Sequence, residues 1–155
     1  MRRIKQQLPV GEVVEILRAG SCGILSLVDA DGEPYGVPMS YAYDGRRSIY
    51  FHSAPSGHKV ACIGNDSRCS FCVVAQDTVV PEEFTTYFRS VIVQGRIHIL
   101  KERSAMVEGL AALCRKYSPG VDAAAEIAKG ISHVTVLRLD IERMSGKQAI
   151  ELVRP

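Results

Sequence analysis

The chain has no tryptophan, little net charge and no long apolar run. Its 19 basic and 17 acidic residues leave a formal net charge of +2, which provides no strong field for nucleic acid or an anionic membrane. No apolar run approaches the roughly 20 residues that a membrane-spanning helix needs, and the basic N-terminus is not followed by the apolar stretch of a secretory signal. The sequence has no repeats, and 46% of its 155 residues are hydrophobic. We therefore expect one domain, 1–155, with a single core and with neither nucleic acid nor a membrane as partner.

The chain also lacks the even number of cysteines that a disulfide framework requires. The five cysteines are Cys22, Cys62, Cys69, Cys72 and Cys114. An odd and scattered set is typical of reduced thiols in the cytoplasm, where we expect the protein. Cys69 and Cys72 have C-x-x-C spacing, but they lie in an expected strand, where residues i and i+3 point to opposite faces. We therefore predict core thiols at these two positions and no metal site.

Hydrophobic periodicity predicts the elements of the first half. Apolar residues at i, i+3, i+4 and i+7 after Pro9 predict an amphipathic helix that ends near Gly20. "CGILSLV", "EPYGVPMSYAY" and "RSIYF" predict three antiparallel strands, with turn signals at 29–32 and 44–45 between them. "HKVACIGN" then predicts a short helix over 58–65.

The second half has longer strand-like segments. "RCSFCVVA" predicts a strand and "QDTVVPEE" (76–83) a loop, because Pro81 interrupts a hydrogen-bonded ladder. "TTYFRSVIVQGRIHIL" predicts a long strand in which Gly95 marks a bulge. Helices are expected around 106–117 and 121–130, before a final strand in "HVTVLRLDIERM". About six strands with short turns and peripheral helices predict a mainly β fold, a small antiparallel barrel.

The loop between the strand that ends in "YFHS" and the following helix is a candidate anion site. If Ser56 caps this helix, the backbone N–H groups of Gly57, His58 and Lys59 lie unpaired in its first turn. Ser53 adds a hydroxyl donor, Lys59 a full positive charge, and His58 one or two donors depending on its protonation. This arrangement suits a phosphate, although an ordinary polar loop with a solvent-facing lysine remains the alternative.

A row of small residues follows one face of the preceding strand. Alternation places Tyr35, Val37, Met39, Tyr41 and Tyr43 on one face and Gly36, Pro38, Ser40 and Ala42 on the other. Pro38 lacks a ladder donor, which predicts an edge strand or a bulge. A flat ring system would fit against the small residues, where unpaired backbone groups could bond its rim. A helix or a partner subunit filling this space is the alternative.

A third feature is Arg89 with Ser90, in an otherwise apolar strand. A buried arginine is costly unless it is paired or faces a polar ligand. The alternative to a ligand is a salt bridge, for which Glu82 and Glu83 are the expected partners. Further along, Gln94, Arg96 and His98 share one face and predict a solvated polar stripe.

Four separated blocks carry a family resemblance: "VPMSYAYD", "IYFHSAPSGHKV", "CSFCVVAQDTVVP" and "TTYFRSVIVQGRI". Their order and spacing resemble those of the flavin-binding split barrels related to pyridoxamine 5′-phosphate oxidase, and in particular the nitroimidazole-resistance branch. The resemblance covers roughly the first two thirds of the chain, and "VTVLRLDIERMSGK" is similar to the family's closing strand. It implies a homodimer of six-stranded antiparallel Greek-key split barrels with FMN at the subunit interface.

The resemblance also implies which residues bind the FMN. They are Val37, Pro38, Met39, Ser40 and Tyr41 along the ring, His52 and Ser53 near the ribityl-phosphate chain, His58 and Lys59 at the phosphate, and Arg89 and Ser90 close to the flavin. The strand Val37–Tyr41 would contact the ring largely through its backbone. His58 stands where the oxidases have arginine, so the charge of the phosphate site would depend on pH.

Two functional classes follow from these features. The first is an FMN-dependent oxidoreductase that passes electrons from a nicotinamide donor to a small, for example nitroaromatic, acceptor. With no G-x-G-x-x-G motif, the nicotinamide would bind transiently over the flavin. Without tryptophan, and without the family's Arg-x-His-type segment after "GKQAIELVRP", oxidation of pyridoxamine phosphate is not expected. The alternative is a non-catalytic flavin- or haem-binding module, with candidate haem ligands at His52, His58, His98 and His133.

Overall fold

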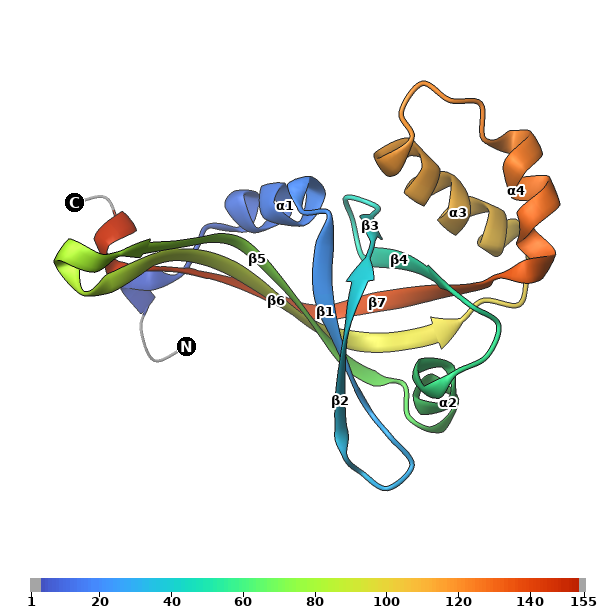
Figure 1. Cartoon of the computed structure of the whole chain (residues 1–155), viewed down its shortest axis with the longest axis horizontal. Coiled ribbons are helices and arrows are strands. Elements are labelled where there is room, and N and C mark those ends of the chain that lie inside the picture. The colour runs from blue at the N-terminus through green and yellow to red at the C-terminus, as the bar shows by residue number, and fades with distance from the viewer. Residues whose placement is uncertain (1–3, 154–155) are drawn as a thin grey trace.

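The computed structural model describes residues 4–153 as one antiparallel sheet with helices around it (Figure 1). The strands are β1 (Cys22–Val28), β2 (Pro34–Ser40), β3 (Ala42–Tyr43), β4 (Ser48–Ser53), β5 (Arg68–Val80), β6 (Thr85–Ile99) and β7 (Thr135–Gln148). The α-helices are α1 (Val10–Ala19), α2 (His58–Asn65), α3 (Arg103–Tyr117) and α4 (Ala124–Gly130). Short 3-10 turns are η1 (Ile4–Gln6), η2 (Pro81–Glu83), η3 (Ile131–His133) and η4 (Ile150–Leu152). None of the helices in this part of the chain is long and apolar enough to cross a membrane.

The sheet closes into a barrel because its two end strands are consecutive in sequence. The strand order is β2-β1-β5-β6-β7-β4-β3, yet only Tyr41 separates β2 from β3 along the chain. One strand, interrupted at Tyr41, therefore pairs with β1 through its first part and with β4 through its last part. From the sequence, β2 and β3 are predicted as a single strand. This accounts for the difference between six predicted and seven observed strands. The predicted mainly β antiparallel barrel is confirmed.

The core lies inside this barrel and follows the expected two-residue period. Alternate residues of the long strands are buried, among them Leu25, Leu27, Phe71, Val73, Val91, Val93, Leu137 and Leu139. The predicted irregularity at Gly95 is confirmed by a register shift between Gln94 and Gly95, opposite which β7 has one additional residue. A Cβ on Gly95 would lie 2.0 Å from the carbonyl oxygen of Asp140. Only glycine allows the two strands to approach this closely.

A long arm projects from the barrel, away from α3 and α4 (Figure 1). It consists of the last part of β5 and the first part of β6, with the last part of β7 beside them. The predicted loop over 76–83 is wrong for residues 76–80, because β5 continues to Val80 and only residues 81–84 leave the ladder. A bulge between Val74 and Gln76 lets the pairing resume. The strand ends at Pro81, which cannot donate a ladder hydrogen bond.

The prediction of core thiols at Cys69 and Cys72 is right in part. All five cysteines are free thiols. Cys69 packs against the core, with its Sγ 3.5 Å from the carbonyl oxygen of Gly95. Cys72 is half-buried and lies on the opposite face of β5, outside the core. The expectation of core thiols therefore holds for Cys69 but not for Cys72.

Candidate functional site

The outer face of β2 is open. Gly36, Pro38 and Ser40 are exposed, whereas Val37 is half-buried and Met39 buried on the inner face. β2 pairs with β1 but not with a second long strand, which confirms the predicted edge position of Pro38. Since these three residues are exposed, no described helix fills the space above them, and that alternative is wrong. The exposed edge remains available to a ligand or a partner subunit.

The helix that follows β4 begins with a glycine, not a serine, at its cap. Gly57 is the N-cap residue, with φ 134° and ψ 172°, and its carbonyl accepts the first helical hydrogen bond from the N–H of Ala61 at 3.0 Å. The prediction of Ser56 as the cap is wrong, because only glycine readily adopts this backbone conformation. No side chain caps α2. The N–H groups of His58 and Lys59 therefore face outward in its first turn without a capping acceptor.

A contact between two rings joins this helix start to β2. The rings of His58 and Tyr35 meet edge to face, with their centroids 4.6 Å apart at 85°. The imidazole is exposed and the Lys59 side chain is half-buried. The two features selected from the sequence, the helix start and the edge strand, are thus neighbours in space.

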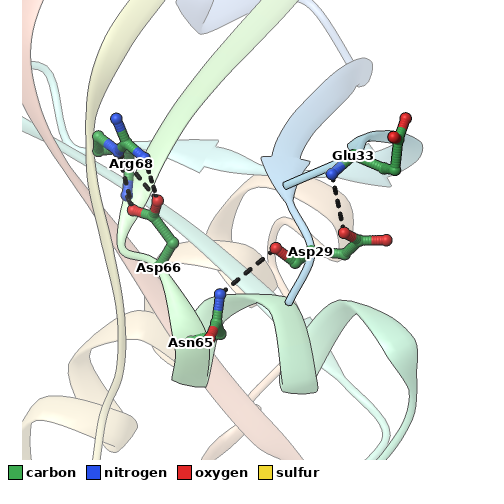
Figure 2. A network of polar contacts seen from close by, with 5 residues as sticks. All are labelled: Asp29, Glu33, Asn65, Asp66 and Arg68. Atoms are coloured by element: carbon green, nitrogen blue, oxygen red, sulfur yellow. Dashed lines mark hydrogen bonds and ion pairs between the residues drawn. The ribbon is translucent and has the colours of Figure 1, made fainter. Parts of the chain in front are cut away.

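The other end of α2 is held by a polar network beside the β1–β2 turn (Figure 2). Asn65 donates a hydrogen bond of 3.4 Å to the carbonyl of Asp29, whose own side chain accepts from the N–H of Glu33 at 2.9 Å. After the helix, the carboxylate of Asp66 accepts hydrogen bonds from the guanidinium and backbone of Arg68. These bonds lower the pKa of Asp66 to about 2. The Asn65–Asp29 hydrogen bond links the end of α2 to the β1–β2 turn.

A cavity of about 420 Å³ lies where β2 and β4 end. Ser40 and His52 line it from the strands, and α3, α4 and η3 supply the remaining walls. His52 is exposed, while the next residue, Ser53, is 9% exposed. Two residues predicted from separate segments, Ser40 and His52, are thereby brought to one place.

Tyr117, at the end of α3, holds the interruption between β2 and β3. Its hydroxyl accepts a hydrogen bond from the N–H of Tyr41 at 2.9 Å, and lies 2.8 Å from the carbonyl of Tyr41 and 2.6 Å from that of Ser21. A hydroxyl has one proton, so it donates to one of these carbonyls at a time. This role of the Tyr117 hydroxyl could not be predicted from the sequence, because Tyr117 lies on an apolar helical stripe and no local signal marks its partner.

The side chain of Tyr41 points away from the open face. It is fully buried, its hydroxyl has no hydrogen-bond partner among the described residues, and burial raises its pKa. The ammonium of Lys116 lies 3.9 Å from the centroid of its ring and donates a hydrogen bond to the carbonyl of Gly20. Burial also lowers the pKa of Lys116. Tyr41 therefore offers no side chain to the open face, and its backbone N–H and carbonyl both contact the Tyr117 hydroxyl.

Arg89 and Ser90 are not brought to the other site residues within the chain, because β1 and β5 stand between β2 and β6. The expected salt bridge to Glu82 or Glu83 is wrong: Glu83 accepts a hydrogen bond from Tyr87 at 2.7 Å, and Arg89 lies 3.9 Å from Glu12 on α1. The pairing fails because the strand continues along the arm, which separates Arg89 from the turn.

The polar stripe on β6 is solvated, as predicted. Gln94 accepts a hydrogen bond from Arg143 at 2.9 Å, Arg96 pairs with Glu142 at 3.3 Å, and His98 lies 3.5 Å from Asp140. The four candidate haem ligands, His52, His58, His98 and His133, are all exposed and lie on different elements.

An apolar row crosses the outer face next to the open edge. Pro38 pairs with Ile24, Ile24 with Cys72, and Cys72 with Ile92, so the four residues are neighbours across β2, β1, β5 and β6. Ile24 is 44% and Ile92 46% exposed, and the adjacent Val74 is 61% exposed. Contiguous exposed apolar residues of this kind are typical of interaction surfaces.

Comparisons with known proteins agree with this architecture. A family model described as pyridoxamine 5′-phosphate oxidase matches residues 9–148. A conserved hypothetical protein from Mycobacterium tuberculosis has a TM-score of 0.80 and 20% identity, with 99% of this chain and 92% of that chain covered. A proposed 5-nitroimidazole antibiotic resistance protein from Bacteroides thetaiotaomicron has a TM-score of 0.79 and 19% identity, with coverages of 92% and 86%.

A third solved structure is described as an FAD- and haem-binding protein from Mycobacterium smegmatis. Its TM-score is 0.76 at 19% identity, with 94% of this chain and 73% of that chain covered. A search of curated protein sequences finds no match. At these identities the solved structures establish the fold, which is the predicted split barrel.

Proposed function

The chain belongs to the pyridoxamine 5′-phosphate oxidase family, and from this premise we propose that it is an FMN-dependent oxidoreductase. It passes electrons from a nicotinamide donor to a small aromatic acceptor, for which a nitroaromatic compound is the model. The observation that carries the proposal is the position of the first turn of α2 beside the open edge of β2, joined by the contact between His58 and Tyr35.

The start of α2 holds the phosphate of the flavin. Its free N–H groups and the helix dipole favour a dianion, and the ammonium of Lys59, a half-buried residue, adds a full charge. Ser53, the last residue of β4, is 9% exposed and stands at the start of the loop that leads to this turn. The exposed imidazole of His58 adds a further donor.

The ring of the flavin lies along the outer face of β2, over Gly36, Pro38 and Ser40. The absence of large side chains there lets a planar ring approach the backbone between Val37 and Tyr41. When bound, FMN supplies hydride and electron transfer, while the protein supplies position and a shielded surface. Tyr41 does not act as a proton donor, because its hydroxyl is buried away from this face and its pKa is raised.

The protein acts as a homodimer with the flavin at the subunit interface. The apolar row formed by Pro38, Ile24, Cys72 and Ile92 supports this, because it borders the proposed ring site and exposes large aliphatic side chains. Ser90 lies on the same outer face as Ile92. In the dimer it reaches the flavin of the second protomer, which accounts for its distance from β2 within its own chain.

Sedimentation of the FMN-loaded protein tests the dimer. Ile92→Lys places a charge in the apolar row, so we expect the variant to be a monomer at concentrations where the wild type is a dimer. Val79→Lys, at a position 67% exposed on the arm, is the matched control and leaves the dimer intact. A wild-type protein that sediments as a monomer at every concentration contradicts the dimer.

Spectroscopy tests the function. The purified protein is expected to show the absorption of bound flavin, and anaerobic mixing with NADH or NADPH is expected to bleach it. Addition of a nitroaromatic acceptor then restores the oxidised spectrum. A flavin that neither nucleotide reduces contradicts the proposed electron donor. A Soret band would instead support the alternative, a haem-binding module, with His52 in the cavity wall as the candidate ligand.

The five free thiols support a location in the cytoplasm.

A further inference from the structure

The cavity between the strand ends and α3–α4 has a chemistry that differs from that of the phosphate site. Its volume of about 420 Å³ falls within the usual range for small-molecule sites. Its walls are mainly aliphatic and come from Leu110, Leu113, Ile127, Ile131 and Val134. We propose that this cavity binds the electron acceptor as a small, flat, mainly apolar molecule that is neutral or cationic, an inference that rests on the proposed function.

The position of the cavity supports this role. Ser40 ends the strand along which the flavin ring is proposed to lie, and the same residue lines the cavity. His52 lines it from β4, one residue before Ser53 on the approach to the phosphate turn. A molecule in the cavity would therefore adjoin the flavin on the side where Ser40 and His52 meet.

The charge of the cavity sets the class of molecule. Glu126 is the only carboxylate in its wall, and Lys and Arg side chains are missing from the residues that line it. Within residues 4–153 the side chains of Glu126 and His52 make no hydrogen bond or ion pair with another residue. An anionic acceptor would be repelled by the exposed, unpaired carboxylate of Glu126 at the cavity wall, whereas a cationic acceptor would pair with it and a neutral ring would pack against the aliphatic side chains.

A second cavity lets the assignment be tested by matched variants. This cavity, of about 640 Å³, lies on the other side of the α3–α4 contact and shares Cys114, Ser118 and Ile127 with the first. Val134 lines only the smaller cavity and Val107 only the larger one. The same substitution at these two valines fills one cavity and leaves the other unchanged.

The experiment titrates three probes of similar shape, benzylamine, benzyl alcohol and benzoate, into the full-length FMN-loaded protein. Binding is followed by NMR of isotope-labelled protein, and the titration is repeated after removal of FMN. We expect the two neutral or cationic probes to shift signals of Leu110, Ile131 and Val134, and benzoate to bind most weakly. Val134→Phe is expected to weaken binding of benzyl alcohol about tenfold, as overpacking of a filled site does. Val107→Phe is expected to leave it unchanged.

A second variant does not depend on repacking. Glu126→Gln at an exposed position is expected to weaken benzylamine about threefold, as loss of an exposed ion pair does, without affecting benzyl alcohol. Glu82→Gln, on the arm, is its control. Benzoate binding as tightly as benzylamine, or equal effects of the two valine substitutions, would overturn the inference. Probe binding in a protein that takes up no flavin would refute the proposed function and the acceptor role, and leave only a binding site. Flavin uptake with probe shifts outside the cavity would refute the inference alone.

Discussion

Replacement of Lys59 by methionine is expected to weaken FMN binding through loss of one interaction with the phosphate. Methionine keeps most of the apolar stem of the half-buried lysine but removes its charge. A hydrogen bond to a charged group contributes about 1.5–3 kcal/mol. Since the Lys59 ammonium is partly accessible to water, we expect the lower end, about 1.5 kcal/mol, which corresponds to roughly a tenfold increase in Kd.

Comparison of FMN with riboflavin isolates the phosphate. Riboflavin has the same ring and ribityl chain but no phosphate, so Lys59→Met is expected to leave its Kd unchanged. The contribution of Lys59 to FMN binding is also expected to decrease at high salt, since an exposed phosphate–ammonium contact is screened. Quenching of flavin fluorescence during titration gives all four dissociation constants.

Lys101→Met, a change of the same kind at an exposed lysine away from the site, is the control and is expected to alter neither constant. The reasoning is refuted if Lys59→Met weakens FMN and riboflavin by the same factor, because Lys59 would then act on the ring or on the fold. Equal affinity of wild type and variant for FMN would place the phosphate elsewhere.

Three further predictions concern the fold that positions the site. Tyr117→Phe removes the hydroxyl that accepts a hydrogen bond from the N–H of Tyr41. It is expected to lower the free energy of unfolding, measured in a urea titration, by about 1–3 kcal/mol. An unchanged free energy of unfolding would mean that water replaces the hydroxyl fully. Gly95→Ala is expected to lower the free energy of unfolding by about 3 kcal/mol or more, because its Cβ would lie 2.0 Å from a carbonyl oxygen. Gly64→Ala, in open space on α2, is expected to raise it by about 0.5 kcal/mol. Similar melting temperatures for the two variants would contradict the packing account. Because the pKa of Asp66 is lowered from 3.8 to about 2, its ionised form stabilises the fold above pH 3.8 and this stabilisation is lost as the pH falls through 2. Asp66→Asn should therefore destabilise the protein at neutral pH but not at the acid end, and a pH-independent difference would remove this role.

Much of the fold is predictable because it depends on local patterns. Alternation along β2 correctly separates the inward-facing residues from the exposed ones, and Gly95 correctly marks an irregularity in the long β6–β7 pair. The short apolar period after Gly57 predicts α2 with its observed bounds, His58–Asn65. In each case the physical cause, side-chain direction or backbone freedom, acts within a few residues of the signal.

The errors arise where contacts between residues that are far apart in the sequence determine the structure. The sequence predicts that residues 76–83 leave the ladder, but after a bulge between Val74 and Gln76 the pairing with β6 resumes, and pairing partners are not encoded in the local pattern. Arg89 pairs with Glu12, which is far away in sequence, in place of a nearby carboxylate. The interruption at Tyr41 depends on a hydroxyl from the end of α3, which no spacing rule connects to it.

The candidate site likewise has parts that can be predicted from the sequence and parts that cannot. The phosphate turn and the edge strand are visible in the sequence because glycine, small residues and a cation pair have local meanings. Their proximity is not visible, and depends on the contact between His58 and Tyr35. The cavity beside Ser40 and His52 was missed entirely, since its walls combine two strand ends, β2 and β4, with α3, α4 and η3, which lie far from them in the sequence.

A crystal structure of the protein with FMN bound tests the central claim most directly. The account predicts that the phosphate accepts hydrogen bonds from the backbone N–H groups of His58 and Lys59, and that the ring lies against Pro38 on the outer face of β2. Density for the phosphate away from the first turn of α2, or a ring on another face of the barrel, would contradict it.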